Sequence, residues 1–190
     1  EQIQGFFDIP VDHLHAAPVI ADYFTQLKDE LGDTVLVSPD VGNVKTAKIY
    51  ATWLGADLAI VDKRRKSGSD VSSENIIGEV DGKTVLMIDD MISTAGTMCA
   101  AANLVMARGA KQVLAACTHP VLVGLAMERL AEAPINRIIV TDTIPCGPRC
   151  KPIEDKLVTL SIAELLGEAM LRIHQDQSVS RLFKRVQANT

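Results

Sequence analysis

Uninterrupted apolar runs alternate with amphipathic runs along most of this chain. Apolar runs without polar–apolar alternation are typical of strands buried on both faces, and the amphipathic runs between them indicate helices that cover such a sheet. We therefore predict an α/β fold, with a mostly parallel twisted sheet and helices on both faces. The expected strands are 34–37, 58–61, 84–88, 112–117, 137–141 and 157–160, and the expected helices are 44–54, 97–107, 121–131 and 162–173.

Length and charge limit the classes of protein that fit this chain. Its 190 residues can bury one full core and include no evident linker, so we predict a single domain over 1–190. The chain has 24 acidic and 19 basic side chains and no basic stripe, which argues against a nucleic-acid partner. The uncharged runs fall short of a membrane span and no signal peptide is seen, so we expect a cytoplasmic protein without a membrane partner.

The four cysteines do not form the disulfide framework of a secreted protein. Cys99 and Cys117 lie in apolar patterns that are typical of core thiols. Cys146 and Cys150 share a short loop that could hold a metal or a redox pair. Because no second pair lies at ligand spacing, the pattern favours neither role.

The segment from Val85 to Thr97 carries the strongest functional signal. An apolar strand ends in Asp89 and Asp90, and a turn of small residues then leads into an apolar helix. Backbone N–H groups at such a loop and helix start bind phosphate, and the helix dipole favours its charge. The acidic pair can accept sugar hydroxyls. From the residues alone, the alternative is a strand–turn–helix corner in which Asp and Ser side chains act as caps.

Two further polar segments follow expected strands. Asp40 could hold Mg²⁺ directly or through water, or it could cap the helix that follows, and its position leaves both roles open. The basic segment 62–65 leads into a Gly/Ser-rich stretch that could fold over a polyphosphate, or could be a solvated surface loop. Ligands of parallel sheets bind beyond the carboxyl ends of the strands, so the place of this segment favours the binding role.

The segment 89–97 resembles the loop that binds phosphoribosyl diphosphate (PRPP) in type I phosphoribosyltransferases and PRPP synthetases. Other segments resemble the ribose-phosphate diphosphokinase family and occur in that family's order. They are 2–8, 38–42, 62–65, 118–120, 141–145 and 178–183. The resemblance covers essentially the whole chain and corresponds to the carboxyl-terminal part of the family's proteins. It implies that residues 1–16 are the trailing end of an amino-terminal domain that is missing here.

This resemblance implies a reaction in which the anomeric hydroxyl of ribose 5-phosphate attacks the β-phosphorus of Mg-ATP, giving PRPP and AMP. Lys63 and Arg65 would stabilise the transferring diphosphoryl group, Arg65 would also contact ribose 5-phosphate, and Asp40 would lie at the Mg²⁺ site. The implied ribose 5-phosphate site comprises Asp89, Asp90, Ser93, Thr94, Ala95, Gly96 and Thr97. Residues that resemble a regulatory nucleotide site between subunits are Ser178, Ser180 and Phe183. The family assembles as dimers within hexamers, so we expect self-association.

The loop departs from the family pattern at Ser93, where Asp is common, and at Ala95, where Gly is frequent. We expect phosphate binding to survive because Ser93 keeps a polar group. In the family the preceding domain supplies the adenine contacts and a histidine near the metal, so we expect an incomplete ATP site. Two alternatives are a PRPP-using phosphoribosyltransferase and a non-catalytic regulatory subunit of the synthetase. The absence of a Gly-x-x-x-x-Gly-Lys-Ser/Thr motif excludes a P-loop kinase.

Overall fold

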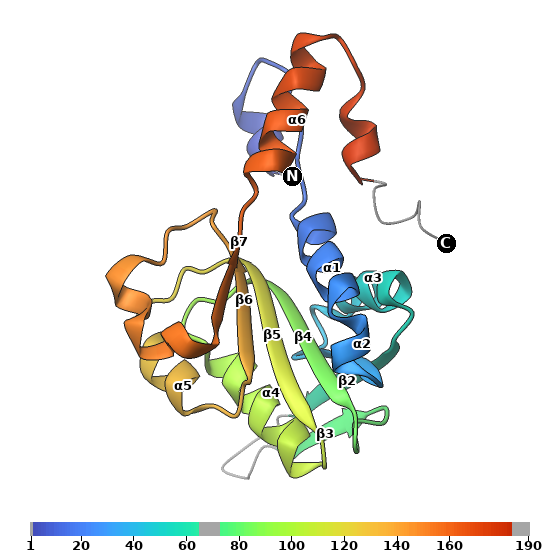
Figure 1. Cartoon of the computed structure of the whole chain (residues 1–190), viewed down its shortest axis with the longest axis vertical. Helices are drawn as coiled ribbons and strands as arrows, with labels where there is room; N and C mark the ends of the chain where they lie inside the picture. Colours follow the sequence, from blue (N-terminus) through green and yellow to red (C-terminus); the bar gives the residue numbers. More distant parts are fainter. Residues whose placement is uncertain (1, 65–72, 184–190) are drawn as a thin grey trace.

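A seven-stranded sheet runs through the centre of the molecule, in the order β3-β2-β1-β4-β5-β6-β7 (Figure 1). The structure is a computed structural model that describes residues 2–64 and 73–183. All neighbouring strands pair in parallel except β3, which runs antiparallel to β2 at one edge. The strands are β1 (Thr34–Ser38), β2 (Asp57–Arg64), β3 (Ser73–Ile77), β4 (Thr84–Met91), β5 (Gln112–His119), β6 (Arg137–Thr141) and β7 (Leu157–Leu160).

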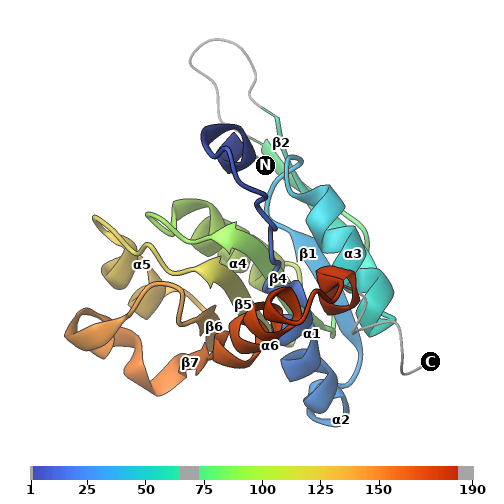
Figure 2. The same ribbon diagram turned by 90° about the horizontal axis from the view of Figure 1, so that it is seen from above.

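Helices cover both faces of this sheet, as the uninterrupted apolar strands predict. Seen from above, α4 and α5 lie on one side of the strands, and α1, α2 and α3 lie on the other (Figure 2). The α-helices are α1 (Ala17–Gln26), α2 (Lys28–Leu31), α3 (Val44–Leu54), α4 (Gly96–Ala107), α5 (Ala126–Glu132) and α6 (Ala163–His174). Short 3₁₀ segments are η1 (Gln2–Phe6), η2 (Gly147–Lys156) and η3 (Val179–Phe183).

Alternate residues of β4 feed two separate hydrophobic cores. Val85 and Met87 pack into the core beneath α4 and α5. Leu86 and Ile88 pack into the opposite core, against α1 and α3. All four side chains are almost fully buried, and adjacent strand residues point to opposite faces of a sheet. The predicted fold class, α/β with a mostly parallel sheet covered on both faces, is therefore confirmed.

Several predicted boundaries were wrong. The strand predicted at 58–61 extends from Asp57 to Arg64 as β2, and residues 73–77, for which no strand was predicted, form β3. An edge strand needs backbone pairing more than apolar side chains, and β3 obtains that pairing from β2 through Asp62↔Asn75 and its neighbours. Helix α5 begins at Ala126 rather than at 121, because Leu122 and Gly124 both take positive φ, which is incompatible with a right-handed helix. Helices α1 and α2 were not predicted.

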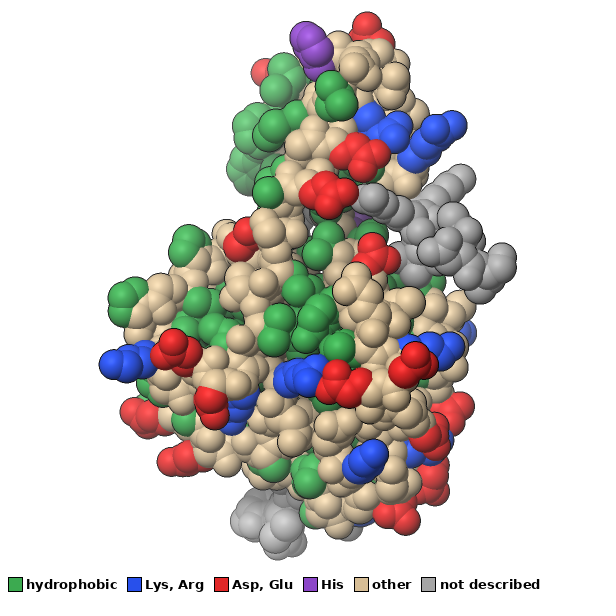
Figure 3. All heavy atoms as spheres, viewed as in Figure 1, with side chains coloured by type: hydrophobic (Ala, Val, Ile, Leu, Met, Phe, Trp, Pro, Cys, Tyr) green, Lys and Arg blue, Asp and Glu red, His purple; other side chains and the backbone are tan. Residues whose placement is uncertain are grey.

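Helix α6 and η3 form a part that stands apart from the sheet (Figure 1), and η1 lies away from α6 in the view from above (Figure 2). Figure 3 shows apolar side chains on the upper part of the molecule. The exposed large apolar residues are Ile3, Phe6, Phe7 and Ile9 in and after η1, and Leu166, Met170, Leu171 and Ile173 in α6. Among the helices that the structure describes, none is long and apolar enough to cross a membrane.

Candidate functional site

The segment from Ile92 to Ala95, which we call the phosphate loop together with Gly96 and Thr97 at the start of α4, connects β4 to that helix. It lies at the carboxyl edge of the sheet, as predicted. The helix has no side-chain cap at its N-terminus, and Ala95 precedes it in a left-handed conformation with φ of 60°. The alternative interpretation, in which Asp and Ser side chains only cap this corner, therefore lacks the hydrogen bonds that it requires.

Each carbonyl of the phosphate loop is held by a donor. The Ile92 and Ser93 carbonyls accept hydrogen bonds from the Leu122 and Val123 N–H groups, at 2.9 and 3.0 Å. The Thr94 carbonyl accepts one from Nη1 of Arg129 in α5, at 2.8 Å. The Ala95 carbonyl accepts the first bond of α4, from the Cys99 N–H at 2.9 Å.

The backbone N–H groups of the same segment, unlike its carbonyls, lack hydrogen-bond partners in the described part of the chain. Within the part of the chain that the structure describes, no backbone or side-chain acceptor bonds the N–H groups of residues 93–98. In a trans peptide the C=O and N–H point in opposite directions, so a carbonyl held on one side fixes the following N–H on the other. A hollow of about 160 Å³ opens here, lined by Asp89 and residues 91–98. A run of free N–H groups at a helix N-terminus suits an anion.

The two acidic residues lie within β4 rather than beyond it. The predicted strand end at 88 was wrong, because β4 continues to Met91 and pairs there with His119 of β5. Asp89 and Asp90 therefore point to opposite faces of the sheet. Asp89 is half-buried and Asp90 is exposed. Although the two side chains leave the strand on opposite faces, their carboxyl groups are close enough for Asp90 to raise the pKa of Asp89.

Three carboxylates and one amide gather beside the phosphate loop. The Asn43 amide donates to the Ile88 carbonyl at 2.6 Å and to Oδ1 of Asp89 at 3.3 Å. Oδ1 of Asp40 accepts the Asn43 N–H at 2.9 Å, directly before α3. This bond reaches the residue before α3 and not the N–H groups of the helix, which has no side-chain cap, so both roles of Asp40 stay predictions. Only one of its carboxylate oxygens is used in this bond.

The pKa of Asp89 is raised, first by burial and then by neighbouring carboxylates. Burial raises the pKa of this carboxyl to about 6, and the Asp90 and Asp40 carboxylates raise it as well, while the Asp90 N–H bond at 2.9 Å opposes the shift. A nearby cation would relieve this repulsion, and carboxylate oxygens with water are the ligands that a hard divalent cation takes. Within residues 2–64 and 73–183, however, no group of three His, Cys, Asp or Glu side chains is placed to hold a metal by itself.

The remaining predicted residues lie elsewhere or outside the described part. Lys63 belongs to β2, which β1 separates from β4, and its side chain is not described. Arg65 lies outside the described residues. Ser178 precedes η3, which contains Ser180 and ends at Phe183, in the part that stands apart from the sheet (Figure 1).

The structure adds side chains that the sequence did not single out. Asn43 and Arg129 carry no local motif, because each acts through a partner that is distant in sequence.

His119, at the end of β5, contacts Thr143 at 3.0 Å. Thr143 in turn bonds the Thr118 carbonyl at 2.9 Å, so the two strand-end segments flagged in the sequence do meet.

Comparison with known proteins agrees with this geometry. A family model described as the phosphoribosyl synthetase-associated domain matches residues 66–184. Ribose-phosphate pyrophosphokinase of Rhodopirellula baltica is 56% identical over 185 residues, which are 96% of this chain and 58% of that protein. Ribose-phosphate pyrophosphokinase 2 of Enterococcus faecalis is 50% identical over 183 residues, 96% of this chain and 56% of that protein.

A solved structure gives the same result. Phosphoribosylpyrophosphate synthetase from Mycobacterium smegmatis superposes with a TM-score of 0.82 and 40% identity, covering 93% of this chain and 56% of that one. The present chain thus spans little more than half the length of these relatives. Taken with the sheet order and the phosphate loop, these similarities show that the chain belongs to the phosphoribosyl synthetase-associated family.

Proposed function

We propose that this chain carries the ribose 5-phosphate site of a ribose-phosphate diphosphokinase. In that reaction the anomeric oxygen of ribose 5-phosphate forms a bond to the β-phosphorus of ATP, the bond between the α,β-bridging oxygen and the β-phosphorus breaks, and AMP leaves. The hydroxyl proton is released, and the other product is PRPP. The names of the relatives favour this activity over that of a PRPP-using phosphoribosyltransferase.

One observation carries the proposal: among the described residues, no acceptor bonds the N–H groups of residues 93–98, whereas the carbonyls of residues 92–95 all accept hydrogen bonds. This arrangement offers several donors to one anion without any change of backbone conformation. A phosphate monoester, with its oxygens carrying the charge, fits such donors better than a neutral group does. The hydroxyls of Thr94 and Thr97 add further donors at the same hollow.

The other roles follow from the positions of the side chains around this anion site. Asp89 and Asp90 would accept hydroxyl groups of the ribose ring. Asp40, with one carboxylate oxygen outside its bond to Asn43, would hold Mg²⁺ through water, together with the acidic pair. The metal would supply charge neutralisation for the ATP phosphates. Lys63 and Arg65 would stabilise charge on the diphosphoryl group as it is transferred.

The wider setting is also part of the proposal. We place the chain in the carboxyl-terminal part of a longer synthetase, as a single domain over 1–190 with 1–16 as the end of the preceding domain. The order of the motifs supports this placement. The ATP site is then incomplete in the chain itself, and the whole enzyme is cytoplasmic and self-associates, with dimers within a hexamer. Ser178, Ser180 and Phe183 would belong to a nucleotide-regulatory site.

The first test is a calorimetric titration of the chain with ribose 5-phosphate, with and without Mg²⁺, using ribose as the matched ligand without phosphate. The double variant Thr94→Ala, Thr97→Ala should lose most of the affinity for ribose 5-phosphate and should keep the wild-type unfolding transition. Absence of binding to the folded wild-type chain would contradict the proposed site. Equal affinity for ribose and ribose 5-phosphate would contradict the role of the phosphate loop.

A further inference from the structure

Arg129 stands out among the groups that hold the phosphate loop. The other carbonyls of the loop accept bonds from backbone N–H groups, which a side-chain substitution leaves in place. The Thr94 carbonyl alone, among residues 92–95, is held by a side chain, through Nη1 of Arg129 at 2.8 Å. A single substitution can therefore release this one peptide plane and leave its neighbours tied.

The same guanidinium also packs against the first residue of α4. A Cβ placed on Gly96 would lie 3.3 Å from Nη1 of Arg129 and 4.0 Å from its Cζ. Glycine at this position thus lets the guanidinium approach the backbone on the side opposite to the free N–H groups. Arg129 is half-buried in this contact, so its orientation is restricted by packing as well as by the hydrogen bond.

The charge of Arg129 is not neutralised by a carboxylate in the described part of the chain, where the ion pairs involve Lys83, Arg137 and Arg172. Its influence extends into the first turn of α4. Burial raises the pKa of the Cys99 thiol, and the Arg129 cation opposes that shift. A positive charge therefore lies behind the phosphate loop, close enough to attract an anion bound in front of it.

We infer that Arg129 is a positioning residue for phosphate binding: it holds the Thr94 carbonyl so that the Ala95 N–H faces the phosphate. Because the peptide between Thr94 and Ala95 is planar and trans, the direction of the Thr94 carbonyl also sets the direction of the Ala95 N–H. Ala95 needs such support, because a non-glycine residue with φ of 60° lies in a sparsely populated conformation. This inference rests on the proposed ribose 5-phosphate site and names a residue in α5 that its phosphate group does not touch.

The test compares Arg129→Met with Arg129→Lys in the full 190-residue chain. Methionine keeps an unbranched stem and a similar helix propensity but removes the guanidinium, and with it the donor and the charge. Lysine keeps a cation that can donate to a single carbonyl. Arg108→Met is the matched control, because Arg108 is exposed and caps the far end of α4, about 18 Å away for a twelve-residue helix.

Two measurements are made on each variant. The first is the backbone order parameter of Ala95 from ¹⁵N relaxation, which does not depend on any ligand. The second is the dissociation constant for ribose 5-phosphate from calorimetry. In Arg129→Met we expect the order parameter to fall from roughly 0.85 to below about 0.6, and binding to weaken about tenfold or more, as for the loss of a charged hydrogen bond. Lysine should restore affinity to within about threefold, and Arg108→Met should match the wild type.

Wild-type order at Ala95 and wild-type affinity in Arg129→Met would overturn the inference. If the wild-type chain binds no ribose 5-phosphate, the proposed function fails, and the order parameter of Ala95 still decides the role of Arg129. If the methionine variant does not fold, Arg129→Leu takes its place, since it also removes the donor, the charge and the contact with Gly96. Unchanged order and affinity in that variant would likewise overturn the inference.

Discussion

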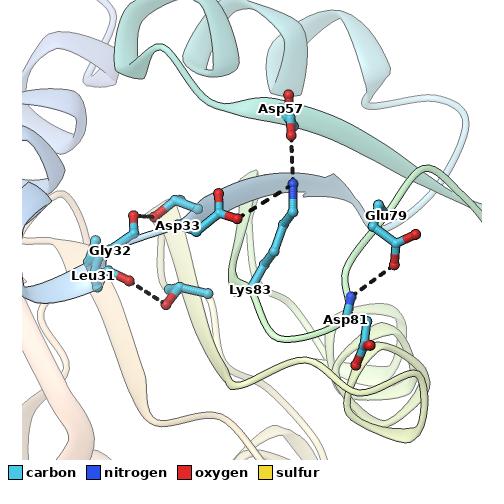
Figure 4. A network of polar contacts seen from close by, with 9 residues as sticks. Leu31, Gly32, Asp33, Asp57, Glu79, Asp81 and Lys83 are labelled. Atoms are coloured by element: carbon cyan, nitrogen blue, oxygen red, sulfur yellow. Dashed lines mark hydrogen bonds and ion pairs between the residues drawn. The ribbon is translucent and has the colours of Figure 1, made fainter.

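The two ends of β4 differ in whether their polar groups have hydrogen-bond or ion-pair partners. At its amino end, Nζ of Lys83 bonds Asp57 at 2.7 Å and lies 3.9 Å from Asp33 (Figure 4). The buried hydroxyl of Thr84 donates to the Leu31 carbonyl at 2.7 Å and accepts from Gln112 at 3.0 Å. We call this the closed edge of the sheet. At the carboxyl end, which we call the open edge, the phosphate loop keeps free N–H groups and Asp89 has a raised pKa.

This difference separates stability from binding. Groups that are already paired with each other hold the fold but offer little to a ligand. Groups that lack a partner cost stability until a ligand supplies one, which is why binding sites are found where pairing is incomplete. A hollow of about 450 Å³ at the closed edge is larger than the one at the phosphate loop. Size alone would therefore point to the opposite end of the strand from the proposed site.

The largest expected effect on stability is that of Gly78→Ala, directly after β3. A Cβ on Gly78 would lie 2.7 Å from Cβ and 2.9 Å from Cα of Ala59 in β2, a strand that is paired on both sides, and φ at Gly78 is +113°. The free energy of unfolding should fall by roughly 3 kcal/mol, measured by urea denaturation. Gly55→Ala is the control, with φ of +63° and open space, and should cost only about 1 kcal/mol. Equal losses in the two variants would show that the close approach to Ala59 is unimportant.

Thr84→Val tests the closed edge directly. Valine keeps the shape but leaves the buried Leu31 carbonyl and the Gln112 amide without the hydroxyl. We expect a loss of about 2 kcal/mol in the free energy of unfolding, with unchanged affinity for ribose 5-phosphate. Both quantities can be taken from denaturant titrations and calorimetry on the same preparation. Weakened binding in this variant would mean that the two edges are coupled.

Asp89→Asn should have the opposite effect on stability. The folded chain keeps a proton on Asp89 up to a pKa of about 6, above the ordinary value of 3.8 for this side chain. The contribution of Asp89 to wild-type stability therefore falls as pH rises between these values and is lowest above them. Asparagine removes the partly buried charge and, with it, the repulsion from Asp90 and Asp40, and we expect a gain of about 1 kcal/mol at pH 7 after allowing for solvent screening. Urea denaturation from pH 4 to pH 7 should show a flatter profile for the variant. A destabilised variant with an unchanged profile would contradict this electrostatic account, and weaker ribose 5-phosphate binding is expected alongside.

The smallest expected effect is that of Gly96→Ala. The new Cβ would meet Nη1 of Arg129 at 3.3 Å, so the guanidinium must shift by a few tenths of an ångström. We expect ribose 5-phosphate binding to weaken by about threefold, as for a fraction of a charged hydrogen bond. The matched control is Gly167→Ala in α6, where nothing lies within 4 Å of the new methyl and binding should not change. Similar changes of ribose 5-phosphate affinity in both variants would show that the contact between Gly96 and Arg129 does not affect binding.

The parts of this fold that depend on local pattern could be predicted from the sequence. The strands around Leu86, Leu114 and Ile139 are apolar without alternation, and each supplies residues to a core on either face. The helix after the phosphate loop was expected at 97–107 and observed from Gly96 to Ala107. Short-range signals of burial and helix start are enough for such elements.

Features that depend on distant partners were missed. Strand β3 exists because β2 lies beside it, and its own residues are too polar to show this. The extension of β4 to Met91 depends on pairing with His119, and Asp89 and Asp90 obscured it because carboxylates are rare in buried strands. Arg129 reaches the phosphate loop from 35 residues away. No periodicity within α5 distinguishes an arginine that holds a carbonyl from one that faces solvent.

The tied carbonyls of the phosphate loop also bear on the kinetics of ligand exchange. Because their partners hold them before any ligand arrives, the free N–H groups need no rearrangement on encounter. Association should therefore proceed at a similar rate for all phosphate esters that reach the open edge. Selection among them would then rest on how long each one stays bound, which the proposed contacts with Asp89 and Asp90 would decide.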